Sequence, residues 1–68
     1  MNKLRQIRRS KDISQEELAK ALGVTQGAVS GWERGSWNPT LETLRKISRV
    51  LKCTVEELIG EADDEGRA

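Results

Sequence analysis

The chain has 68 residues, 35% of them hydrophobic and 34% charged, and its formal net charge is +1 at pH 7. This length makes one small domain with a modest core, which excludes a deep substrate cavity. The sequence contains no run of 18 apolar residues and no charged segment followed by an apolar leader. We therefore expect neither a membrane span nor secretion, and we place the protein in the cytoplasm.

The charges are distributed unevenly along the chain. Residues 1–12 carry five Lys or Arg and one Asp, whereas residues 53–68 carry six Asp or Glu and one Arg. A basic end of this kind attracts an anionic partner, and the acidic end repels one. The alternative is that both segments are simply solvated faces.

Two helices are predicted before the first glycine. The first runs from roughly Asn2 to Ser10, and a short connection follows it. Ser14 and Glu17 form a capping-box pattern that opens a second helix, which ends at Gly23. The apolar residues that mark the inward side of the first helix and its connection are Leu4, Ile7 and Ile13.

A third helix is predicted between Thr25, its N-cap, and Gly35, where it ends. Its residues divide into two faces at helical spacing. The inward face comprises Ala28, Val29 and Trp32. The outer face comprises Gln26, Gly27, Ser30, Gly31 and Arg34.

Two further helices complete the predicted fold, which is all-α with five short helices. Residues 36–39 form a turn that ends with Pro39, and Thr40 restarts the helical pattern. Thr54 and Glu57 repeat the capping box and open the last helix. The apolar stripe of the fourth helix is Leu41, Leu44, Ile47 and Leu51, and that of the fifth is Val55, Leu58 and Ile59.

The domain is expected to occupy residues 1–60, and residues 61–68 to form an acidic, disordered tail. No histidine is present, and the single cysteine, Cys53, is expected to be a small buried residue. The chain therefore lacks the ligands of a zinc site and the partners of a nucleophilic triad. We expect no enzymatic activity, no metal, no cofactor and no small-molecule ligand.

The residue types on the outer face of the third helix suit DNA. Two helices joined by a tight turn can present the second helix to a DNA groove. Glutamine can pair with adenine in the major groove, and Ser and Thr can bind phosphates. The sequence thus predicts double-stranded DNA as the partner.

Residues 14–59 resemble the helix-turn-helix domain of the Cro/C1 (xenobiotic-response-element type) family of prokaryotic and phage repressors. The resemblance rests on the run from SQEELA through WERG to NPTLETL. It implies a five-helix, lambda-repressor-like DNA-binding domain, and a transcriptional regulator that acts as a small repressor by occupying operator DNA.

The resemblance also implies roles for individual residues. Arg8 and Glu33 match an ion pair that joins the first helix to the third. The residues expected to face bases are Gln26, Gly27, Ser30 and Gly31, with Gln26 as the main base contact and Ser30 second. The residues expected at phosphates are Gln15, Thr25, Arg34, Ser36, Trp37, Asn38 and Thr40, aided by basic residues of the first helix. For Gln15 and Thr25, ordinary helix capping is the alternative.

Two features depart from the family pattern. Many relatives place Lys, Gln or Arg where Gly27 and Gly31 stand, and each glycine should cost the helix about 1 kcal/mol relative to alanine. The glycines either admit close backbone approach or a thymine methyl, or they belong to a weakly specific site. Trp32 is expected in the core, whereas Trp37 either packs against the start of the fourth helix or is exposed beside DNA or a partner chain.

The family commonly binds DNA as a symmetric dimer, so we expect a homodimer formed through the fifth helix and the end of the fourth. A second hypothesis is an antitoxin-like or scaffold interaction module on the same fold. In that case the apolar end around Leu58 and Ile59 would bind another protein.

Overall fold

The computed structural model describes residues 3–60, which contain five α-helices and no strand, as predicted. The predicted start of the first helix, Asn2, and the acidic segment 61–68 lie outside the described residues. The helices are α1 (Leu4–Ser10), α2 (Gln15–Leu22), α3 (Gln26–Arg34), α4 (Leu41–Leu51) and α5 (Val55–Ile59).

Both predicted capping boxes are present. The Oγ of Ser14 accepts from the backbone N–H of Glu17 at 3.0 Å, and Oε1 of Glu17 accepts from the N–H of Ser14 at 2.8 Å. Thr54 and Glu57 repeat this exchange at the start of α5, with distances of 3.0 and 2.8 Å. Each box satisfies N–H groups that lack a partner within the first turn of the helix.

The predicted helix ends are also confirmed at two glycines. Gly23 ends α2 with φ of 74°, and Gly35 ends α3 with φ of 80°. This left-handed backbone favours glycine because it has no Cβ. Helix α4 ends instead at Lys52, with φ of 54°, a stop that no glycine marks in the sequence.

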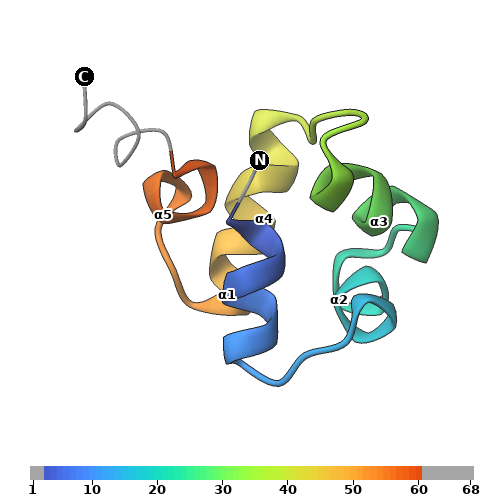
Figure 1. Cartoon of the computed structure of the whole chain (residues 1–68), viewed down its shortest axis with the longest axis horizontal. Helices are drawn as coiled ribbons and strands as arrows, with labels where there is room; N and C mark the ends of the chain where they lie inside the picture. Colours follow the sequence, from blue (N-terminus) through green and yellow to red (C-terminus); the bar gives the residue numbers. More distant parts are fainter. Residues whose placement is uncertain (1–2, 61–68) are drawn as a thin grey trace.

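Every helix contributes to one apolar core. In Figure 1, α2 and α3 lie on one side of α1 and α4, and α5 lies on the other side. Helix α2 packs against α3 and α4, while α1 packs against α3 and α5. The buried hydrophobic residues are Leu4, Leu18, Ala19, Val29, Trp32, Ile47, Leu51 and Leu58.

Three predictions about burial need correction. Leu41 is 59% exposed, because it lies about 90° around α4 from the mean direction of the other apolar residues of its stripe. Cys53 is only half-buried, at the margin of the core. Leu58 is fully buried, so it cannot form the exposed apolar end of an interaction module.

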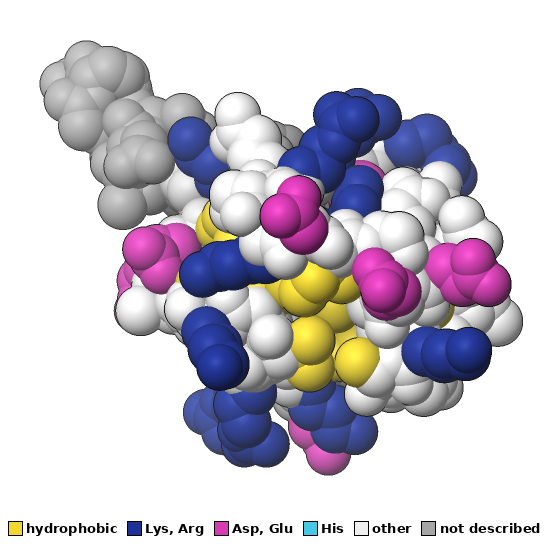
Figure 2. Space-filling view, turned by 90° about the horizontal axis from the view of Figure 1, so that it is seen from below, with side chains coloured by type: hydrophobic (Ala, Val, Ile, Leu, Met, Phe, Trp, Pro, Cys, Tyr) yellow, Lys and Arg dark blue, Asp and Glu magenta, His cyan; other side chains and the backbone are white. Residues whose placement is uncertain are grey.

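The surface of the domain is mixed in character. The face drawn in Figure 2 shows apolar side chains at its centre, ringed by basic and acidic ones. Partly buried apolar residues of this kind are expected where a small chain cannot cover its whole core. None of the helices in residues 3–60 has both the length and the apolar character that crossing a bilayer requires.

Candidate nucleic-acid interface

The turn between α2 and α3 fixes the orientation of α3. The connection consists of Gly23, Val24 and Thr25, and the N–H of Val24 donates to the carbonyl of Ala19 at 3.0 Å. Oγ1 of Thr25 accepts from the N–H of Ala28 at 3.1 Å, which makes Thr25 the predicted N-cap. Since Val29 and Trp32 are buried, the opposite face of α3 is directed away from the core.

The four residues predicted to face bases differ in their exposure. Gln26 and Gly27, in the first turn of α3, are exposed. Ser30 is half-buried, and its hydroxyl accepts a hydrogen bond from Nη1 of Arg34. Gly31 is buried. A direct contact between Gly31 and a base stays a prediction, and it would require the side chain that covers Gly31 to move.

The structure brings Arg8 and Glu33 together, as the resemblance implies. Nε of Arg8 donates to Oε2 of Glu33 at 2.6 Å, and Nη2 of Arg8 donates to Oε1 at 3.3 Å. Their side chains are only 9% and 4% exposed, respectively. This two-pronged pair joins α1 to the last turn of α3 and so holds the outer face of α3 at a fixed angle to the rest of the domain.

A hydrogen-bonded chain that the sequence analysis missed links this pair to the start of α3. Nε2 of Gln15 donates to Oε1 of Glu33 at 2.9 Å. Nε2 of Gln26 in turn donates to Oε1 of Gln15 at 3.3 Å. Two glutamines eleven residues apart give no pairing signal in a sequence, because their contact depends on how α2 and α3 pack.

The same chain sets the acidity of Glu33. Partial burial alone would raise the pKa of Glu33, but hydrogen bonds from Arg8 and Gln15 lower it, as do the charges of Arg8 and Arg5. The net result is a pKa below the ordinary value of a glutamate. The carboxylate therefore stays ionised at neutral pH and holds Gln15 through a charged acceptor.

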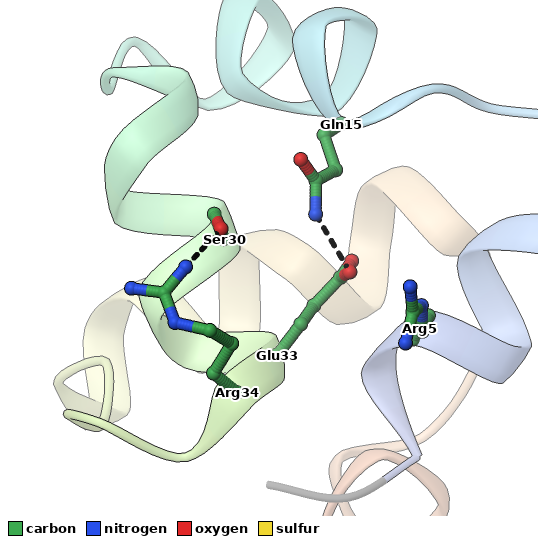
Figure 3. A pocket seen from close by; sticks show the side chains of 5 residues that line it. All are labelled: Arg5, Gln15, Ser30, Glu33 and Arg34. Atoms are coloured by element: carbon green, nitrogen blue, oxygen red, sulfur yellow. Dashed lines mark hydrogen bonds between the residues drawn. The ribbon is translucent and has the colours of Figure 1, made fainter.

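A hollow of about 240 Å³ lies between α1, the start of α2 and the later turns of α3. Figure 3 shows its lining side chains coming from these three helices, with Gln15 directed to Glu33 and Arg34 directed to Ser30. They are Arg5, Gln15, Ser30, Glu33 and Arg34. The lining thus offers two guanidinium groups, an amide, a hydroxyl and one carboxylate. In residues 3–60 no three His, Cys, Asp or Glu side chains are grouped to hold a metal ion. Arg5 is the lining residue that the sequence analysis placed only among the basic residues of the first helix.

The residues predicted to bind phosphates divide between helix ends and the turn after α3. Thr25 and Thr40 both act as N-caps, since Oγ1 of Thr40 accepts from the N–H of Thr43 at 3.1 Å. Ser36, Trp37 and Asn38 are exposed in the turn between α3 and α4. Capping is thus established for both threonines, and their contact with phosphate stays a prediction.

Trp37 is exposed, as the second alternative expects, but it also makes a contact that neither alternative included. Its indole lies against Gly31 of α3, where a Cβ added to Gly31 would overlap the five-membered ring. The residue is nevertheless 58% exposed. Trp32, in contrast, is buried in the core as predicted, with 7% exposure.

Comparison with known proteins gives a consistent result. The model of the family described as "Helix-turn-helix" matches residues 4–58. The chain is 42% identical over 57 residues to the HTH-type transcriptional activator BcrR of Enterococcus faecalis, covering 84% of this chain and 28% of that protein. It is 31% identical over 62 residues to the cryptic phage CTXphi transcriptional repressor RstR of Vibrio cholerae, covering 91% of this chain and 56% of the relative.

A solved structure agrees with this relationship. The crystal structure of NHTF, a hypothetical transcription factor from Neisseria, superposes with a TM-score of 0.74 at 36% identity. The match covers 81% of this chain and 62% of that one. This chain spans only about a quarter of BcrR and about half of RstR, so the relatives carry further segments beyond the matched domain. The match over residues 4–58, together with the capped α2–turn–α3 unit, shows that this chain belongs to the helix-turn-helix family of the Cro/C1 type.

Proposed function

We propose that this protein is a sequence-specific DNA-binding transcriptional regulator that places α3 in the major groove of an operator. The observation that carries this proposal is the exposed start of α3 beside a hollow lined by two arginines. Family membership supports the same function. The relatives' names as transcriptional regulators give no support to an interaction module that does not bind DNA.

Gln26 is the proposed main base contact. It is exposed, and one N–H of its amide is directed to Gln15. The amide retains its oxygen and a second N–H, which are the acceptor and donor that pairing with adenine requires. The bond to Gln15 also restricts the rotamers of Gln26 before DNA arrives, which lowers the entropy lost on binding.

The hollow is the proposed seat of a DNA phosphate. Arg5 and Arg34 supply positive charge, and Gln15 and Ser30 supply polar groups. Glu33 lies in the same hollow, but Arg8 neutralises its carboxylate from the protein side. A phosphate there would fix the register of α3 in the groove without specifying a sequence.

Duplex binding at increasing salt tests the phosphate contacts. A duplex selected from random DNA by the wild-type protein should bind more weakly as salt rises, because bound counterions are released. Arg5→Ala and Arg34→Ala should each lower the salt slope by about 1. Lys20→Ala, which also removes one positive charge, at an exposed residue in the last turn of α2, is the matched control and should leave the slope unchanged. Affinity that does not depend on salt would exclude the proposal.

Substitution on α3 tests base contact. Gln26→Ala combined with Ser30→Ala should weaken binding to the selected duplex by at least tenfold and reduce its preference over random DNA. Gln6→Ala combined with Ser10→Ala makes the same chemical changes at exposed positions of α1 and should leave affinity unchanged. An unchanged preference in the α3 double variant would refute base contact by these residues.

The proposed mode of action is repression by occupation of the operator, carried out in the cytoplasm where the chromosome lies.

We further propose a homodimer through α5 and the end of α4. One helix in one groove gives modest affinity, and two protomers on a two-fold symmetric operator bind more tightly. Because Leu58 is buried, the half-buried Ile59 is the residue of the apolar end of α5 that could contact the second protomer. Sedimentation should show two protomers on a palindromic duplex; a monomer at micromolar concentration both with and without DNA would contradict the dimer.

A further inference from the structure

The contact between Trp37 and Gly31 is the unusual feature of the outer face. A Cβ added to Gly31 would meet Nε1, Cδ1 and Cε2 of Trp37. The indole therefore lies directly on the backbone of α3, in the space where any other residue at this position would place its side chain. Gly31 is buried as a result, although it is on a solvent-facing part of the helix.

The turn after α3 holds the indole in this place. Gly35 has φ of 80°, and its N–H donates to the carbonyl of Trp32 at 3.2 Å. The N–H of Ser36 donates to the carbonyl of Gly31 at 3.0 Å. These bonds fold the chain back along α3, so that Trp37 reaches Gly31, six residues before it in the sequence.

The indole extends the face of α3 that begins with Gln26 and Gly27. Residues four apart lie one above the other on a helix, so Gly27 and Gly31 share one side of α3. At Gly27 the nearest atom to an added Cβ is Oγ1 of Thr25, at 3.8 Å, and the position is open. The two glycines therefore differ: one leaves the face bare, and the other supports an aromatic ring.

We propose that Trp37 is a specificity-determining residue, whose exposed hydrocarbon edge contacts a thymine methyl group in the major groove in place of the side chain that residue 31 lacks. This inference rests on the proposed DNA-binding function. Nε1, the one hydrogen-bonding atom of an indole, is the atom nearest to Gly31. The atoms of the ring beyond these three are all carbon, and carbon suits the C5 methyl of thymine and not a phosphate oxygen.

Replacing thymine with deoxyuridine, one position at a time, tests the contact in the duplex selected by the wild-type protein. Deoxyuridine lacks only the C5 methyl group. At one position or more, this loss should weaken wild-type binding about fourfold, the effect of one methyl-sized apolar contact. Trp37→Ala should bind the thymine and deoxyuridine duplexes equally at that position. Trp37→Phe, which keeps an aromatic ring, should retain part of the discrimination.

Gly31→Ala tests whether the glycine is the seat of the ring. The added methyl group should displace the indole from α3. The fluorescence maximum of Trp37 should then shift, while the fluorescence of Trp32 stays constant, and the deoxyuridine effect should disappear. The spectrum of Trp37→Ala gives the fluorescence of Trp32 alone. In the Trp37→Ala background, Gly31→Ala should have no further effect on discrimination, whereas two independent effects would add.

The outcomes separate this inference from the proposed function. If the wild type shows salt-dependent binding but the deoxyuridine effect persists in Trp37→Ala, the role of Trp37 is overturned and the proposed function is not. The same holds if Trp37→Ala changes only the sedimentation of the protein, since the indole would then be a contact between protomers. No salt-dependent duplex binding at all would refute the proposed function itself.

Discussion

Arg8 meets Glu33 through two hydrogen bonds, and its Nη1 also donates to the carbonyl oxygen of Ile13 at 2.6 Å. One guanidinium thus joins α1, the connection to α2 and the last turn of α3. Gln15 adds α2 to the same carboxylate. The orientation of α3 consequently depends on an ion pair that lies below the outer face and is itself largely covered.

Glu33→Gln should destabilise the fold by about 2 kcal/mol, because Arg8 would lose its charged partner while remaining nearly buried. The unfolding free energy in urea measures this cost. Glu16→Gln makes the same chemical change at an exposed position of α2 and should cost less than about 0.5 kcal/mol. Equal costs for the two variants would show that the pair contributes nothing beyond a surface charge.

The lowered pKa of Glu33 gives the stability a definite pH dependence. Burial acts to raise this pKa, but the hydrogen bonds from Arg8 and Gln15, together with the charges of Arg8 and Arg5, outweigh it. Because the folded pKa lies below the unfolded value of about 4.3, the contribution of Glu33 is fully present above that pH and is lost as pH falls through the folded pKa. The difference in unfolding free energy between wild type and Glu33→Gln should therefore be constant from pH 7 to pH 5 and shrink below about pH 4. A difference that grew with acidification would contradict the assignment.

Local patterns in the sequence were sufficient to predict the helices. Each capping box combines a hydroxyl residue and a glutamate three positions apart, and both pairs exchange the expected bonds. Gly23 and Gly35 likewise end helices where a positive φ is needed. The stop at Lys52 has no such residue; Lys52 itself takes the left-handed backbone there, and the N–H of Cys53 donates to the carbonyl of Ser48 at 3.0 Å.

The candidate site was predicted less completely, because its contacts join residues that are distant in sequence. The outer face of α3 followed from helical periodicity, but the bond from Gln26 to Gln15 follows from how α2 and α3 pack. The seating of Trp37 on Gly31 depends on the path of the turn after α3. Periodicity assigns a residue to a face of a helix and does not show what another segment places over it.

Cys53 should react slowly with iodoacetamide in the folded protein. Burial raises the pKa of its thiol, the charge of Glu57 raises it further, and Lys11 opposes them. Less thiolate is then present at pH 8, and the thiolate is the reactive form. Mass spectrometry should show alkylation several-fold slower in buffer than in urea. Cys53→Ser combined with Asn38→Cys moves the thiol to an exposed turn and should abolish this difference; equal rates for the wild type in buffer and urea would refute the prediction.

Replacing the glycine at each end of α3 with alanine should change the free energy of unfolding in opposite directions. Gly27 is within the helix and open around its added Cβ, so Gly27→Ala should raise the unfolding free energy by up to about 1 kcal/mol. Gly35 has φ of 80°, which strains any residue with a Cβ, so Gly35→Ala should lower it by about 1 kcal/mol. Gly35→Asn should recover part of this loss, since asparagine tolerates left-handed backbone better. Urea unfolding of the three variants measures the signs, and a gain at Gly35→Ala would show that the turn relaxes to another conformation.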